Sequence, residues 1–156
     1  HQPRNLQNTL EDEIDSVRSD FPGAVVRVEG SVPDVRVRAS ELLDSVFRNL
    51  LKNAIQHNDK ELPEVTITVT EGDQYVRVQV ADNGPGVSDD RKESIFGKSQ
   101  KGLDSQGTGV GLYLVQSLVE SYGGAVWVED NEPTGAVFVV ELPVANRRDS
   151  QDDHRE

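Results

Sequence analysis

Apolar residues return every three or four positions in three stretches of the chain. These stretches cover residues 5–19, 41–57 and 108–122. A period near 3.6 residues is typical of a helix with one face against a core. The pattern therefore predicts three helices, the second of them capped by Ser40.

Strict alternation of apolar and polar residues marks the strands. It is clearest over residues 65–70 and 75–81, and the short Gly- and Asp-containing connection between them is typical of an antiparallel hairpin. Shorter alternating stretches cover residues 24–28, 35–38, 125–129 and 136–142. Hairpins and helices without βαβ alternation predict an α+β sandwich, with a mixed, mostly antiparallel sheet and helices on one face.

The remaining segments divide the chain. Residues 88–96 predict a short helix, whereas residues 97–107 lack apolar periodicity and predict a long functional loop. Residues 144–156 are charged and nearly free of apolar side chains, which predicts a disordered acidic tail. We therefore expect an N-terminal helical segment over 1–20 and one domain over 21–143.

Composition excludes several classes of function. The chain has no cysteine, which rules out disulfides, thiolate metal sites and a cysteine nucleophile. Its 28 acidic and 16 basic residues give a net charge of −12, which argues against binding nucleic acid or an anionic membrane. The same balance fits a salt-adapted surface and an ordinary acidic protein equally well. No apolar run reaches the about twenty residues of a membrane span and no signal pattern precedes the domain, so we expect a cytoplasmic protein.

Two asparagines four residues apart, Asn49 and Asn53, share one face of the second predicted helix. Their amide oxygens are hard ligands of the kind that Mg²⁺ accepts. Two polar residues at the rim of a core, with no ligand, are the alternative.

Asp82 stands where the hairpin's second strand ends, and Gly84 and Gly86 follow it. A carboxylate there can accept a hydrogen bond from the exocyclic amine of adenine, and the glycines let the base lie close to the backbone. Taken alone, the segment is also compatible with an ordinary turn.

Gly107, Gly109 and Gly111 lead into the third predicted helix. Free backbone N–H groups and the positive end of the helix dipole favour a phosphate there. A flexible linker is the alternative, although a linker needs no helix directly after it. The spacing lacks the third glycine of a dinucleotide fingerprint, and the Gly97-Lys98-Ser99 segment lacks the earlier glycine of a Walker loop.

In this order, these motifs resemble the catalytic, ATP-binding domain of sensor histidine kinases. The wider superfamily also holds type II topoisomerases, mismatch-repair ATPases and a heat-shock chaperone. The resemblance covers about residues 21–143 and rests on an N box (49–54), a G1 box (82–86), a reduced F box (95–96), a G2 box (107–112) and a terminal motif (135–138). It implies the two-layer α/β sandwich known as the Bergerat fold.

The resemblance also implies roles for individual residues. Asp82 would bind adenine, Asn53 would hold Mg²⁺ with Asn49 in support, and Lys101 would join both asparagines in catalysis. The implied contacts of ATP also include Gln56, His57, Gly84, Gly86, Val87, Ile95, Phe96, Lys98, Lys101, Gly107, Thr108, Gly109, Val110, Gly111 and Leu112.

Three departures from the family pattern matter. ATP-hydrolysing relatives carry a glutamate at position 49 that activates water, and an asparagine cannot act as that base. Gln56 and His57 stand where the family usually has Lys and Tyr, so a cation on the phosphates would have to come from Lys98 or Lys101. The F box also lacks its second aromatic residue.

The resemblance further implies the partners. The chain's histidines, His1, His57 and His154, lie outside the phosphoacceptor motif of the family. We therefore expect either a fragment that follows a missing dimerisation hairpin or a separate catalytic domain. In both cases we expect a monomer that phosphorylates a histidine on such a hairpin, with a response regulator downstream. One alternative is an anti-sigma-type serine kinase of the same fold. The other is a degenerate nucleotide-binding scaffold, a domain that binds nucleotide or none and only holds partner proteins together.

Overall fold

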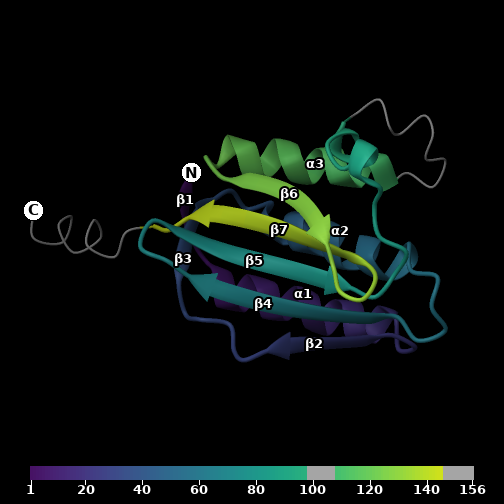
Figure 1. The fold of residues 1–156 in the computed structure, drawn as a ribbon. Helices are drawn as coiled ribbons and strands as arrows, with labels where there is room; N and C mark the ends of the chain where they lie inside the picture. The colour runs from purple at the N-terminus through teal and green to yellow at the C-terminus, as the bar shows by residue number, and fades with distance from the viewer. Residues whose placement is uncertain (98–107, 146–156) are drawn as a thin grey trace, which may run out of the picture.

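Five strands form one mixed sheet, and three helices lie on one side of it (Figure 1). The structure is a computed structural model that describes residues 1–97 and 108–145. The strand order is β2-β4-β5-β7-β6; β2 pairs with β4 in parallel and every other pair is antiparallel. The strands are β2 (Val25–Glu29), β4 (Glu64–Glu71), β5 (Tyr75–Asp82), β6 (Ala125–Asp130) and β7 (Ala136–Pro143). The predicted mixed, mostly antiparallel sheet is confirmed.

The helices are α1 (Leu6–Asp20), α2 (Leu43–Gln56) and α3 (Thr108–Ser121). α2 is central, because it packs against α1 on one side, α3 on the other and β4 and β5 beneath it. Its apolar face is fully buried at Phe47, Leu50 and Leu51. Burying one such side chain contributes about 2 kcal/mol, so this face is the main attachment of the helix layer to the sheet.

α1 belongs to the same core as α2. Its apolar positions are at most 2% exposed: Leu6, Leu10, Ile14 and Val17. Glu13 is also buried, and its carboxylate accepts two hydrogen bonds from the Arg48 guanidinium of α2, at 3.1 and 3.2 Å. The boundary expected at residue 21 therefore does not divide the packing.

A two-stranded sheet of β1 (Gln2–Asn5) and β3 (Arg36–Ala39) lies beside the large one. No pattern in the sequence predicts β1. Asn5 then caps α1, since its side-chain oxygen accepts the N–H of Asn8 at 2.8 Å.

Local structure departs from the sequence predictions at three places. Residues 88–96 form two short 3-10 turns, η1 (Asp89–Arg91) and η2 (Ser94–Phe96), in place of a helix. Ser40 accepts the N–H of Leu42, in the turn before α2, so it does not cap the helix itself. Ala145, assigned to the tail, is buried and donates its N–H to the carbonyl of Arg36; residues 146–156 lie outside the described part.

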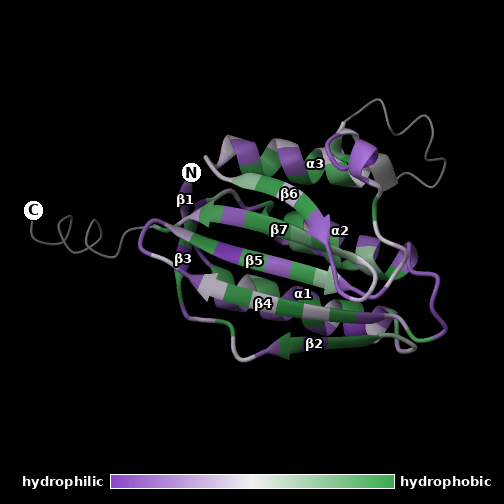
Figure 2. Ribbon diagram, in the orientation of Figure 1, coloured by the Kyte–Doolittle hydropathy of each residue, from purple (hydrophilic) through white to green (hydrophobic). Residues whose placement is uncertain are grey.

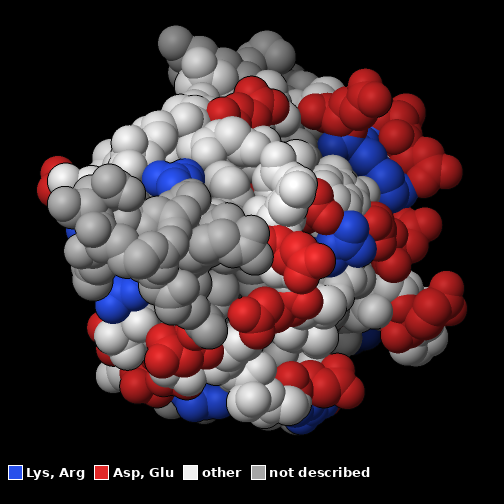
Figure 3. Space-filling view, turned by 90° about the vertical axis from the view of Figure 1, so that its left-hand side faces the viewer, with Lys and Arg blue, Asp and Glu red and all other residues white. Residues whose placement is uncertain are grey.

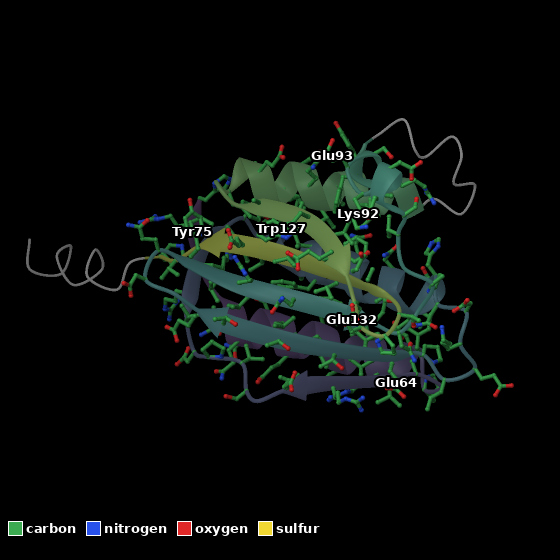
Figure 4. The ribbon with its side chains drawn as sticks, in the orientation of Figure 1. Glu64, Tyr75, Lys92, Glu93, Trp127 and Glu132 are labelled. Atoms are coloured by element: carbon green, nitrogen blue, oxygen red, sulfur yellow. The ribbon has the colours of Figure 1, made fainter. Side chains whose placement is uncertain are left out.

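The two faces of the large sheet differ. Apolar and polar residues alternate along the strands (Figure 2), and the apolar side chains on the helix side form the core. Trp127 lies on the opposite face (Figure 4). The Arg77 guanidinium lies 5.5 Å from its ring centroid and donates to the Glu141 carboxylate at 2.6 Å. Within the described ranges, no helix is both long and apolar enough to cross a membrane.

Candidate functional site

The Asp82 carboxylate is buried at the end of β5. Its exposed fraction is 8%, and its Oδ1 accepts the backbone N–H of Gly84 at 2.9 Å and that of Ala136 at 3.2 Å. Burial raises the pKa of this carboxyl, and the two backbone N–H groups act against that rise. Among the residues that the structure describes, both donors to this side chain reach Oδ1, which leaves Oδ2 to accept a ligand donor.

The turn between β6 and β7, residues 131–135, packs directly on Asp82. Asn131 donates from Nδ2 to the Asp82 carbonyl oxygen at 2.7 Å. Gly135 has a φ of +109°, and a Cβ there would overlap the same carbonyl and lie 3.0 Å from Oδ1. Gly86 (φ +84°) also lies close to this turn, since its Cβ would lie 3.0 Å from the Gly135 carbonyl oxygen. Only glycine fits such a left-handed, crowded backbone.

Asn83, next to Asp82, connects the loop to the segment after α2. Its Oδ1 accepts from the Asn58 amide at 2.7 Å and from the Glu64 N–H at 2.9 Å. A Cβ on Gly84 would lie 3.4 Å from the Asn58 backbone and 3.2 Å from the Asp82 Oδ1. The loop that follows β5 is therefore held from both sides, by the segment after α2 and by the β6–β7 turn.

α2 meets α3 at Asn49. The Asn49 amide donates from Nδ2 to the carbonyl of Ser45, one turn earlier, at 2.7 Å. Its Oδ1 faces Gly111, where an added Cβ would lie only 2.7 Å away. Gly111 therefore leaves room for the Asn49 amide at the first turns of α3, and Asn53 lies half-buried one turn further along α2.

The remaining predicted site residues have different surroundings. Lys98, Lys101 and Gly107 lie outside the described residues, and Thr108, Gly109 and Val110 form the first turn of α3. Gln56 and His57 are exposed at the end of α2, and Val87 is half-buried. Ile95, Phe96 and Leu112 pack in the hydrophobic core, where the rings of Phe96 and Phe138 lie 6.0 Å apart. Contacts of all these residues with ATP stay predictions.

Lys92 links η1 to the end of β6. Its ammonium pairs with Asp89, donates to the Val87 carbonyl at 3.0 Å and lies 3.0 Å from the Asp130 carboxylate (Figure 4). These contacts raise the pKa of Lys92, chiefly through the hydrogen bond with Asp89. No role is predicted from the sequence for Lys92, Asn131 or Ala136, because none of them lies in a motif that spacing alone can identify.

A divalent cation would need amide and phosphate oxygens at this site. The described residues hold no group of three or more His, Cys, Asp or Glu side chains able to bind a metal. Acidic and basic side chains are interspersed on the face shown in Figure 3. The half-buried Asn53 amide, with Asn49 beside it, has the hard donor that Mg²⁺ prefers.

A family model and curated relatives both indicate which family this chain resembles. Residues 39–146 match the family model described as histidine kinase-, DNA gyrase B- and HSP90-like ATPase. The adaptive-response sensory kinase SasA of Prochlorococcus marinus (strain MIT 9313) is 32% identical over 84% of this chain and 34% of its own length. Sensor protein FixL of Bradyrhizobium diazoefficiens is 35% identical over 71% of this chain and 21% of its own. The chain thus spans about a third or less of these relatives.

Solved structures share the fold. The nucleotide-free catalytic domain of histidine kinase ThkA has a TM-score of 0.81 at 29% identity, covering 91% of this chain and 94% of that one. ThkA in complex with the response regulator protein TrrA has a TM-score of 0.74 at 26% identity, covering 91% of this chain and 41% of that one.

Proposed function

The chain belongs to the family of histidine kinase-, DNA gyrase B- and HSP90-like ATPases, and we propose that it is the catalytic domain of a two-component sensor histidine kinase. In this proposal it binds ATP with Mg²⁺ and donates the γ-phosphate to a histidine on a separate dimerisation domain of the same full-length protein. A response regulator then takes the phosphoryl group from that histidine. The sensory kinase SasA and the sensor protein FixL, both similar to this chain, support this assignment.

The observation that carries the proposal is the buried Asp82 carboxylate. Keeping a carboxylate at 8% exposure is costly unless a ligand or the protein supplies hydrogen bonds. Two backbone N–H groups hold Oδ1, and the exocyclic amine of adenine would complete the set at Oδ2. Guanine has a carbonyl oxygen at that position and would repel the carboxylate.

The phosphates would lie between α2 and the first turn of α3. The N-terminus of α3 offers backbone N–H groups that its own helix leaves unpaired, together with the positive end of its dipole. Asn53 would hold Mg²⁺ with Asn49 in support, and the bound metal supplies charge neutralisation on the phosphates. The Asn49 amide is no base, so it orients its neighbours without activating water, and ATP is kept for a protein acceptor.

Calorimetric titration with ATP and Mg²⁺ tests the nucleotide site. We expect Asp82→Asn to remove measurable binding, because the amide offers the adenine amine a weaker acceptor and can turn its own NH₂ toward it. Asp73→Asn, an exposed substitution in the β4–β5 turn, is the matched control and should bind like the wild type. Unchanged ATP affinity in Asp82→Asn would refute the assignment, and absence of binding by the wild type would favour the scaffold alternative.

Phosphotransfer needs a second experiment. The isolated chain should not label itself with γ-phosphate, but it should label a histidine-bearing hairpin added in trans from its full-length protein. We expect Lys101→Ala to slow this transfer more than it weakens ATP binding. Transfer to serine on a partner protein, with none to the hairpin, would favour the anti-sigma-type kinase.

A further inference from the structure

We propose that Asn131, in the turn between β6 and β7, is a positioning residue for Asp82 and thereby sets the preference of the site for adenine. The inference rests on the proposed function, because it concerns the base of the nucleotide that Asp82 would bind. Asn131 itself need not touch the nucleotide. It holds the backbone of the residue that does.

The Asn131 amide is used at both ends. Its Nδ2 donates to the Asp82 carbonyl at 2.7 Å, and its Oδ1 accepts the N–H of Glu132 at 2.9 Å. Its own backbone N–H donates to the Gly135 carbonyl at 3.0 Å, closing the turn. The side chain is half-buried, and Figure 4 marks Glu132 at the tip of the same turn. The oxygen of this amide therefore stabilises the turn, and its nitrogen hydrogen-bonds to Asp82.

The same turn reaches Asp82 from a second side. Ala136, the first residue of β7, donates its N–H to the Asp82 Oδ1 at 3.2 Å. Gly135 leaves no space for a side chain between the turn and the Asp82 carbonyl. Asp82 is thus held at its carbonyl by Asn131 and at its carboxylate by Ala136. A shift of the turn would move both contacts together.

Orientation of the carboxylate matters because hydrogen bonds weaken steeply with distance and angle. With Oδ1 held by two N–H groups, Oδ2 points in one direction and can meet the adenine amine only there. Loss of the Asn131 donor removes one of the contacts that hold Asp82 and widens the range of carboxylate directions. The bond to the adenine amine should weaken, while contacts of the sugar and phosphates stay.

The test therefore compares two nucleotides that differ only in the amine. Calorimetry gives the Kd of ATP and of purine riboside triphosphate, which lacks the 6-amino group, and their ratio isolates the amine contact. We expect wild type to prefer ATP and Asn131→Ala to reduce that preference by roughly three- to tenfold. The Kd of purine riboside triphosphate should change little.

Two further variants separate positioning from general damage to the turn. Asn131→Asp keeps an acceptor for the Glu132 N–H but cannot donate to Asp82, so it should lose the preference as Asn131→Ala does. Thr134→Ala removes a 3.3 Å hydrogen bond from the same turn to the Asn83 carbonyl and should leave the ratio unchanged. Asn131→Asp also carries the test if Asn131→Ala does not fold.

The outcomes are distinguishable. If a folded Asn131→Ala or Asn131→Asp variant keeps the ratio of the two Kd values that the wild type shows, the inference is overturned and the proposed function stays intact. An equal loss in Thr134→Ala overturns it as well, since the effect would then belong to the turn as a whole. A wild type that binds neither nucleotide would overturn the proposed function and the inference with it.

Discussion

The contact between Asn49 and Gly111 makes Gly111→Ala a substitution in which two effects oppose each other. In a helix, replacing glycine by alanine ordinarily stabilises a protein by about 0.5–1 kcal/mol. Here the added Cβ would lie 2.7 Å from the Asn49 Oδ1, whereas ordinary contacts begin near 3.4 Å. The Asn49 side chain must therefore withdraw by several tenths of an ångström.

The size of the penalty follows from what holds Asn49 in place. Its Nδ2 donates to the Ser45 carbonyl at 2.7 Å, and turning the amide away from position 111 breaks that bond. A hydrogen bond of this kind contributes about 1 kcal/mol, which cancels the helical gain. We expect Gly111→Ala to leave the free energy of unfolding nearly unchanged and to weaken ATP binding, since Asn49 is displaced.

A double-mutant cycle measures the contact directly. Urea unfolding of wild type, Gly111→Ala, Asn49→Ala and the double variant gives four free energies. In the Asn49→Ala background the clash is absent, so Gly111→Ala should stabilise the protein by about 1 kcal/mol. The same stabilisation in the wild-type background, together with unchanged ATP affinity, would refute the close approach of α3 to Asn49.

Five other outcomes can be checked. Gly135→Ala should destabilise the fold by about 3 kcal/mol or more in urea unfolding, because a left-handed φ and a backbone oxygen both oppose a Cβ, whereas Gly23→Ala has open space and should be neutral. Arg48→Ala should lower the free energy of unfolding by about 2–3 kcal/mol, because it leaves the Glu13 carboxylate buried without its partner. Glu13→Gln should lower it clearly less, because the Arg48 guanidinium is half-exposed and water can solvate it. Equal losses in the two variants would contradict this reasoning. ATP affinity, measured by calorimetry at stepped pH, should fall as the pH drops through the raised pKa of Asp82, because only the ionised carboxylate is a full acceptor; a flat profile contradicts this. Without ATP, the Asp82 carboxyl of the folded protein loses its proton at a higher pH than it does in the unfolded chain. The contribution of Asp82 to the free energy of unfolding should therefore decline as the pH rises from about 3.8 through the raised pKa. A melting temperature indifferent to molar KCl would end the hypothesis of a salt-adapted surface.

Helices and strands with strong periodicity could be predicted from the sequence, and elements that depend on a distant partner could not. The apolar face of α2 and the β4–β5 hairpin follow from local spacing, and both formed as expected. β1 has no such signal: its sequence, Gln-Pro-Arg-Asn, becomes a strand only because β3 lies alongside, with Arg4 opposite Val37. The two 3-10 turns, η1 and η2, likewise replace a helix that the local pattern of residues 88–96 favoured.

The candidate site divides in the same way. Some site residues stand in motifs that can be recognised from their spacing in the sequence: Asn49, Asp82 and Gly111. The fold brings Asn49 and Gly111 together. Asn131 is 49 residues beyond Asp82 and lies in a turn that reads only as a break between two strands. Nothing in the sequence around Asn131 indicates that its amide hydrogen-bonds to Asp82, because that contact is created by the pairing of β7 with β5.

The register of that pairing connects the core to the position of the Asp82 carboxylate. β7 pairs with β5 so that Val137 lies opposite Ala81. The residue before Val137, Ala136, therefore lies beside Asp82 and donates its N–H to the carboxylate. The register is fixed by the alternation of β7, whose Phe138 is buried on the helix side. A slip of one residue would turn that ring outward and withdraw the N–H from Asp82 at once. The hydrophobic pattern that builds the sheet therefore also orients the carboxylate. A β7 variant that loosens the core should lose the proposed preference for adenine before it unfolds.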